Sequence, residues 1–128
     1  LRALIPAELR HRVGFCADTC HLYSAGYDLV NAYDAVWEEW ERLIGIEHLH
    51  CLHLNGSKTP FASHKDRHEL IAEGSLGPEP FRRIMRDPRF ADVIKVLETP
   101  KGDDMVTNDR RMLRRLRAYG RGGPKRVR

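Results

Sequence analysis

The sequence predicts a parallel α/β fold, for two reasons. Short apolar runs alternate with longer segments of helical periodicity, as in strand-helix-strand units whose parallel strands are joined by helical crossovers. Ionisable residues follow the apolar runs, at the strand ends where parallel sheets place their active sites. We therefore expect three parallel strands, over residues 12–17, 48–54 and 93–98, neighbouring in sequence order with helices on one side.

The length and composition predict one soluble domain. The chain has 128 residues, 41% of them hydrophobic, and no apolar stretch approaches the ~20 residues of a membrane span. No signal peptide pattern opens the chain, so we expect a cytoplasmic protein. Residues 101–128 hold 10 Lys and Arg against 3 Asp and Glu, so this end is strongly basic. The tail over residues 119–128 is expected either to be a disordered, solvated terminus or to touch phosphates without sequence preference.

The first expected strand ends at Asp18, and a helix follows it after a turn. The turn is predicted by Gly26-Tyr27-Asp28, and Asn31 is expected to cap the helix. Gly45 is expected to end the helix after Ile44. The residues expected to share its apolar face are Ala35, Val36, Trp40, Leu43 and Ile44.

The second expected strand delivers His53 near its carboxyl end, and a long polar loop runs from His53 to Gly74. Loops of this length are either functional or disordered, and the polar content of this one favours function. We expect His48 and His50 to be packing residues and His64 to lie on the loop surface.

Two further helices surround the third strand. Gly77-Pro78 is expected to open a helix over residues 79–86, which Asp87-Pro88 ends. The residues expected to be buried in it are Phe81, Ile84 and Met85. The last helix is expected over residues 104–118, and its packing residues are Met105, Met112, Leu113 and Leu116.

The three cysteines, Cys16, Cys20 and Cys51, lie in or beside apolar runs, where a free cysteine behaves as a small buried hydrophobe. We expect reduced thiols. A cysteine-rich zinc site needs paired cysteines at short spacing, and no second pair accompanies Cys16 and Cys20.

The predicted strand ends bring metal-ligating residue types together. Asp18, His53 and Glu98 each fall at the carboxyl end of an expected strand. Oxygen and imidazole ligands suit Zn²⁺ or Mn²⁺.

A second group is expected from His21 with Asp66 and His68, because Asp66 and His68 point to one side of an extended segment. Clustered divalent ions can clamp a phosphodiester, which predicts phosphoryl hydrolysis. Each residue also has an ordinary alternative: a histidine at a helix start, a solvated strand end or a surface ion pair.

Four motifs carry a resemblance to the endonuclease IV (AP endonuclease 2) family. Residues 13–21 with Ala-Gly-Tyr-Asp at 25–28 resemble one family signature, and His-Leu-Asn-Gly-Ser-Lys at 53–58 resembles HLNDSK. Asp-Arg-His-Glu at 66–69, together with Ile-Ala-Glu-Gly at 71–74 and Leu-Gly at 76–77, resembles DRHENIGEG. Leu-Glu-Thr-Pro at 97–100 resembles LETP of the last strand. The order and spacing match from residue 12 to about residue 118.

This resemblance implies a TIM barrel enzyme that binds up to three zinc ions, with Mn²⁺ as an alternative. It cuts double-stranded DNA 5′ to an abasic site in base excision repair. Carried over, Asp18, His53 and Glu98 match the ligands of one ion, with Asp18 and Glu98 as catalytic residues. The ligands matched to another ion are His21, Asp66 and His68.

The chain departs from the family in length and at two positions. Residues 1–118 resemble only the C-terminal part of an eight-stranded barrel, so we expect a piece of a longer protein or an incomplete enzyme. Such a chain is expected to need the N-terminal half of the barrel or to self-associate. Gly56 stands where the family has a carboxylate, and Ala72 stands where it has glycine. The alternatives are a sugar isomerase or epimerase on the same barrel, and a catalytically dead half-barrel that binds metal.

Overall fold

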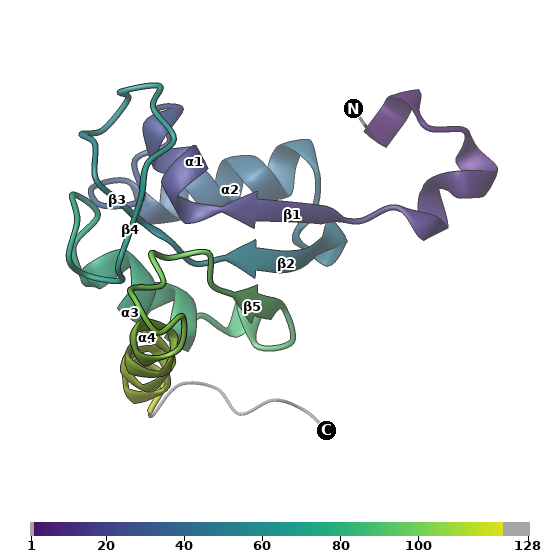
Figure 1. Cartoon of the computed structure of the whole chain (residues 1–128). Helices are drawn as coiled ribbons and strands as arrows, with labels where there is room; N and C mark the ends of the chain where they lie inside the picture. The colour runs from purple at the N-terminus through teal and green to yellow at the C-terminus, as the bar shows by residue number, and fades with distance from the viewer. Residues whose placement is uncertain (1, 122–128) are drawn as a thin grey trace.

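The computed structural model describes residues 2–121, and a parallel sheet with strand order β1-β2-β5 lies at its centre (Figure 1). The strands are β1 (Phe15–Asp18), β2 (Leu49–His53) and β5 (Ile94–Val96). Both neighbouring pairs are parallel. The predicted strands, their order and their direction are therefore confirmed, although each observed strand is shorter than the expected range.

One face of this sheet is covered and the other is open. Ala17 pairs with Leu52, and both are buried in the hydrophobic core. Cys16 pairs with Cys51, which pairs with Ile94, and the side chain of Ile94 is 59% exposed. Because side chains alternate along a strand, the residues at the strand ends, Asp18 among them, share the open face with Cys16.

Helix α2 (Tyr33–Leu43) supplies much of the covered side, and it differs in detail from the prediction. Asn31 does not cap it, because the backbone N–H groups of Val30 and Asn31 bind the Asp28 carboxylate in a turn before the helix. The helix buries Val36 and Trp37, whereas Ala35 and Leu43 are exposed, so the predicted apolar face was wrong for these last two residues. Gly45, at φ 95°, follows the helix end as expected.

Short helical segments surround the first strand. The 3-10 helices η1 (Arg2–Leu4) and η2 (Ala7–Arg12) precede β1 and extend away from the body of the molecule (Figure 1). Helix α1 (Thr19–Ser24) directly follows β1, before the predicted turn at residues 26–28, and was not predicted. The Asp18 carboxylate starts α1 by accepting the first free backbone N–H groups.

The long loop contains a small antiparallel pair of strands, β3 (Gly56–Ser57) and β4 (His68–Glu69), that the sequence did not predict. Gly74 packs so closely on this pair that a Cβ atom there would collide with the carbonyl oxygen of Ser57. These contacts hold the two ends of the loop together, and the backbone N–H groups of Ala62 and His64 join its middle to the carbonyl oxygens of Tyr23 and Ser24.

The C-terminal helices pack on one another below β5. Helix α3 (Glu79–Arg86) has the predicted bounds and buries Phe81 and Ile84, and η4 (Pro88–Phe90) follows it. Helix α4 (Thr107–Tyr119) begins later than expected. Met105, which lies before it, is 63% exposed and Leu113 is 39% exposed, so the prediction that these two residues pack was wrong, whereas Met112 and Leu116 are buried as expected.

His48, the last residue of the short 3-10 helix η3 (Ile46–His48), is half-buried. His50 is exposed, so the packing role predicted for His50 was wrong. His64 lies on the loop surface as expected. Within the described residues no helix is long and apolar enough to span a membrane. Most of the predicted basic tail, residues 122–128, lies outside the part of the chain that the structure describes.

Candidate metal centre

Asp18 occupies the junction between β1 and α1, and its two carboxylate oxygens have different partners. Oδ1 accepts hydrogen bonds from the backbone N–H groups of Cys20 (2.8 Å) and His21 (3.1 Å). Oδ2 accepts one from the side-chain amide of Asn55, at 2.8 Å. The Asp18 side chain is only 6% exposed, so the helix start and the amide together hold a buried carboxylate in one orientation.

Asn55 is fully buried and joins Asp18 to Glu98. Its Nδ2 donates to Asp18, and its Oδ1 accepts the backbone N–H of Glu98 at 2.8 Å. Its own backbone N–H donates to Thr19 Oγ1 at 2.9 Å, and Thr19 Oγ1 donates to the Asn55 carbonyl oxygen at 2.6 Å. Reasoning from the residues missed Asn55, whose only signal was its place in the segment at residues 53–58.

Asp18, His53 and Glu98 come together as predicted, with ligand atoms within 4.8 Å of one another. His53 Nδ1 lies 2.7 Å from Glu98 Oε2 and 3.9 Å from Asp18 Oδ2. The hydrogen bond from His53 lowers the pKa of the Glu98 carboxyl below its usual value. Glu98 is therefore ionised at neutral pH.

His21, Asp66 and His68 also meet, and Asp18 lies beside them. Asp66 bridges the two histidines, at 3.1 Å from His21 Nε2 and 3.1 Å from His68 Nε2. His68 Nε2 lies 3.6 Å from Asp18 Oδ2. Since Asp18, His21 and His68 also have ligand atoms within 4.8 Å, the two predicted groups adjoin one another at Asp18.

The surroundings of the two ring nitrogens of His68 fit a cation bound at Nε2. Its Nδ1 lies 3.1 Å from the carbonyl oxygen of Glu98, which can only accept, so the ring proton belongs on Nδ1. Nε2 is buried and makes no hydrogen bond within the described residues, although it faces the carboxylates of Asp18 and Asp66. A lone pair facing carboxylate oxygens is unfavourable unless a cation or proton lies between them. Metal-ligating histidines commonly have this arrangement, in which the second ring nitrogen donates to a carbonyl.

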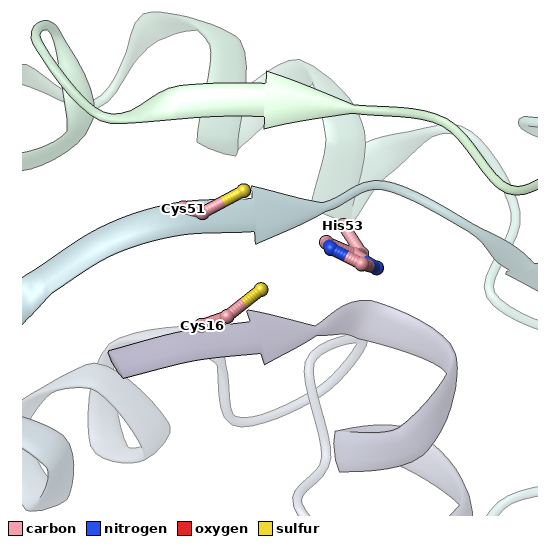
Figure 2. A group of neighbouring side chains, drawn as sticks. All are labelled: Cys16, Cys51 and His53. Carbon is pink, nitrogen blue, oxygen red and sulfur yellow. The ribbon is translucent and has the colours of Figure 1, made fainter. Parts of the chain in front are cut away.

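The thiols contradict the expectation that all three cysteines are buried. Cys20 is buried, but Cys51 is only partly buried and Cys16 is exposed. Cys16 and Cys51 lie beside His53 on the open face of the sheet, as Figure 2 shows, and the three form a third group of ligand atoms within 4.8 Å. Partial burial of the thiol, aided by a hydrogen bond with Cys51, raises the pKa of Cys16 to about 11.

Four of the six predicted ligands border an open hollow of about 470 Å³ at the carboxyl ends of the strands, whereas Asp66 and His68 do not line it. Its walls include Cys16, Asp18, His21, His53 and Glu98. The hollow therefore leads from solvent to Asp18, His21, His53 and Glu98.

The chain is similar to one protein family and to several proteins named probable endonuclease 4. The model of the family described as xylose isomerase-like TIM barrel matches residues 2–116. A probable endonuclease 4 of Geotalea daltonii is 52% identical over 107 residues, which cover 81% of this chain and 38% of that protein. A probable endonuclease 4 of Chloroflexus aggregans is 46% identical over 112 residues, or 86% of this chain and 39% of that protein.

A solved structure agrees with these relatives. The crystal structure of endonuclease IV from Thermus thermophilus superposes with a TM-score of 0.75 and 36% identity, covering 84% of this chain and 39% of that chain. The chain thus spans about two fifths of the length of these relatives. It belongs to the AP endonuclease 2 family of xylose isomerase-like TIM barrels and has the fold of part of such a barrel.

Proposed function

We propose that this chain supplies part of the zinc centre of an apurinic/apyrimidinic endonuclease. Such an enzyme hydrolyses the phosphodiester 5′ to an abasic site in double-stranded DNA during base excision repair. The observation that carries the proposal is the meeting of two ligand groups at Asp18, with the buried Nε2 of His68 facing two carboxylates. The names of the relatives support the reaction class.

In this proposal Asp18, His53 and Glu98 hold one zinc ion. The ligands of a second ion are His21, Asp66 and His68. Bound zinc would activate water for attack on phosphorus and offset the charge that develops on the phosphate. The set has no thiolate, which agrees with zinc or manganese bound by nitrogen and oxygen.

The other contacts orient these ligands. Asn55 holds Asp18 and the Glu98 backbone in register, and the carbonyl of Glu98 fixes the tautomer of His68. His53 hydrogen bonds to Glu98, which keeps that carboxylate ionised and directed toward the hollow. A substrate phosphate entering the hollow would meet Asp18 and Glu98, which we propose as the catalytic residues.

The second ligand group argues against a sugar isomerase or epimerase. A single-metal isomerase would need only Asp18, His53 and Glu98, whereas His21, Asp66 and His68 lie beside them with two contacts of 3.1 Å. Because the chain spans only 38% of the Geotalea relative, we propose that it does not incise DNA by itself.

The first prediction is that His68→Ala lowers the zinc content of the purified chain, measured by elemental analysis. Removing one of three protein ligands should weaken binding at that site by well over the roughly tenfold that an outer-shell change costs. His64→Ala is the matched control, because His64 is an exposed histidine of the same loop. Zinc bound at other sites contributes equally to both variants, so the difference in their zinc contents reports on the His68 site alone. Equal zinc contents in the two variants would refute the site.

Activity is tested in a chimera in which this chain replaces the matching segment of the Geotalea relative. The chimera should incise abasic-site DNA, and its His68→Ala form should be inactive while its His64→Ala form stays active. Incision that survives His68→Ala would overturn the proposed function. Strong incision by this chain alone would overturn the proposal that it is incomplete.

A further inference from the structure

Cys16, Cys51 and His53 form a donor set that the proposed zinc centre does not use as a whole. Cys16 lies opposite Cys51 in the parallel register of β1 and β2, and His53 follows Cys51 by two residues on the same face. Figure 2 shows the two sulfur atoms on one side of the strands, with the His53 ring beside them. The three ligand atoms lie within 4.8 Å of one another.

This set is open to an incoming ion. Cys16 is exposed, Cys51 is partly buried, and Cys16 and His53 both border the hollow of about 470 Å³. The set is also carried on rigid elements, because two of its members are neighbours in a hydrogen-bonded parallel pair. Small rotations of three side chains would bring their donor atoms to metal-ligand distances without a change in the strands.

Its chemistry differs from that of the adjoining groups. Asp18, His53 and Glu98 offer two carboxylates and one imidazole, which suit borderline and hard cations. Two thiols and one imidazole instead select thiophilic ions, since soft ions such as Cu⁺ and borderline ions such as Zn²⁺ bind thiolate strongly.

We propose that Cys16, Cys51 and His53 form a separate site for a thiophilic d¹⁰ metal ion, with Zn²⁺ and Cu⁺ as its cellular occupants. On binding, two metal–sulfur bonds form and each thiol releases one proton to solvent, so no oxidant or reductant is needed. The imidazole supplies the third ligand.

The two sites share His53, whose Nδ1 lies 2.7 Å from Glu98 Oε2. An ion held by the thiols therefore competes with Glu98 and Asp18 for this ring. If the proposed zinc centre is correct, occupation of the sulfur site weakens it, and thiophilic metals inhibit the enzyme.

The second prediction is that Cys16, Cys51 and His53 bind a thiophilic ion. It is tested by titrating the purified chain with Cd²⁺, a thiophilic d¹⁰ probe. A phosphine reductant keeps the thiols reduced. Wild type should bind one Cd²⁺ at this site, detected by the ultraviolet absorption of sulfur-to-cadmium charge transfer, which ions held by nitrogen and oxygen ligands do not give. Cys16→Ser and Cys51→Ser should each lose most of this absorption and bind Cd²⁺ at least about tenfold more weakly.

Two controls separate this site from the others. Cys20→Ala removes the third, buried thiol, and His68→Ala removes a ligand of the proposed zinc centre, so both should keep the absorption. Circular dichroism verifies that each variant is folded, and Cys16→Ser changes one atom of an exposed side chain. Absorption that survives both serine variants, or that is lost in Cys20→Ala, would overturn the sulfur site. The charge-transfer absorption should persist in His68→Ala even if the proposed zinc centre is wrong, so this result tests the sulfur site independently of the proposed function.

Discussion

At the scale of single residues, Ala72 holds a backbone conformation that residues with a side chain rarely adopt. Its φ is 68°, in the left-handed region, and it stands where the resembled family segment has glycine. This conformation costs an L-residue about 1–2 kcal/mol, because Cβ approaches the carbonyl oxygen. The chain therefore carries local strain in the loop that presents Asp66 and His68.

The third prediction is that Ala72→Gly stabilises the protein. Relief of the strain should exceed the entropy that glycine adds to the unfolded chain, for a net gain of about 0.5–1 kcal/mol. Ala35→Gly is the control, because Ala35 is exposed within α2 and should lose about 0.5–1 kcal/mol on substitution. Urea unfolding measures both, and a loss of stability in Ala72→Gly comparable to that of the control would contradict the strain.

The asparagine at residue 55 shows how one buried side chain organises a site. Its amide is satisfied on both sides, by Asp18 and by the backbone N–H of Glu98. A buried amide with both partners in place holds a single orientation, because any rotation would leave polar atoms without partners. Asn55 therefore holds Asp18, at the end of β1, at a defined distance from Glu98, which follows β5.

At the scale of elements, the start of α4 depends on one exposed carboxylate. Asp104 accepts backbone N–H groups of Val106 (3.1 Å) and Thr107 (2.9 Å), and it also binds the Thr107 hydroxyl. The hydrogen bond from the Thr107 hydroxyl, with those from the backbone, lowers the pKa of Asp104 to about 2. The N–H of Thr107 belongs to the first helical turn, where backbone N–H groups lack a partner within the helix, and that of Val106 belongs to the residue before it.

The fourth prediction is that Asp104 contributes to the loss of folding stability at acid pH. The pKa of Asp104 is depressed in the folded chain, so its stabilising contribution is complete above about pH 4, the unfolded value, and is lost as pH falls toward about 2. Asp104→Asn cannot titrate, so its unfolding free energy should fall less than that of wild type over this range.

Asp103→Asn, at the neighbouring exposed carboxylate, is the control and should follow wild type. Chemical denaturation at pH 7, 4 and 2.5 gives the comparison. Parallel pH profiles for Asp104→Asn and wild type would show that the contact does not support the helix.

At the scale of the whole molecule, the parallel sheet has an open face, and within residues 2–121 its edge strands β1 and β5 have no further strand beside them. Ile94 on the open face is 59% exposed, and Cys16 on the edge strand is also exposed. Unpaired strand edges and contiguous apolar surface promote association with another chain. We therefore expect the surface that carries the predicted ligands to contact another chain.

The fifth prediction is that the isolated chain self-associates. Sedimentation velocity should detect dimers or larger species, and Ile94→Lys should shift the distribution toward monomer. Leu4→Lys is the control: Leu4 is 82% exposed but lies in the N-terminal segment away from the sheet (Figure 1). A stable, folded wild-type monomer would count against an open barrel face.

Much of the architecture could be read from local patterns. Helix α3 has the predicted bounds because Pro78 and Pro88 limit it chemically on either side, and Phe81 and Ile84 repeat at helical spacing. The strand order follows because strands that are consecutive in sequence and joined by right-handed crossovers usually lie next to one another in the sheet. Helix α2 begins later than predicted, because Asp28 and not Asn31 accepts the backbone N–H groups of the turn before it. Asp and Asn both favour such turns, so the sequence does not distinguish them.

The sequence alone determined the fold class, the family and the order of the predicted ligands, because these depend on periodicity and motif spacing. Only the tertiary structure decided that Asp18 lies between both ligand groups, that Asn55 joins β1 to the end of β5, and that Cys16 lies exposed beside Cys51. These features depend on strand register and on which face of the sheet is covered. Both are set by packing between segments far apart in the chain, which no local pattern encodes.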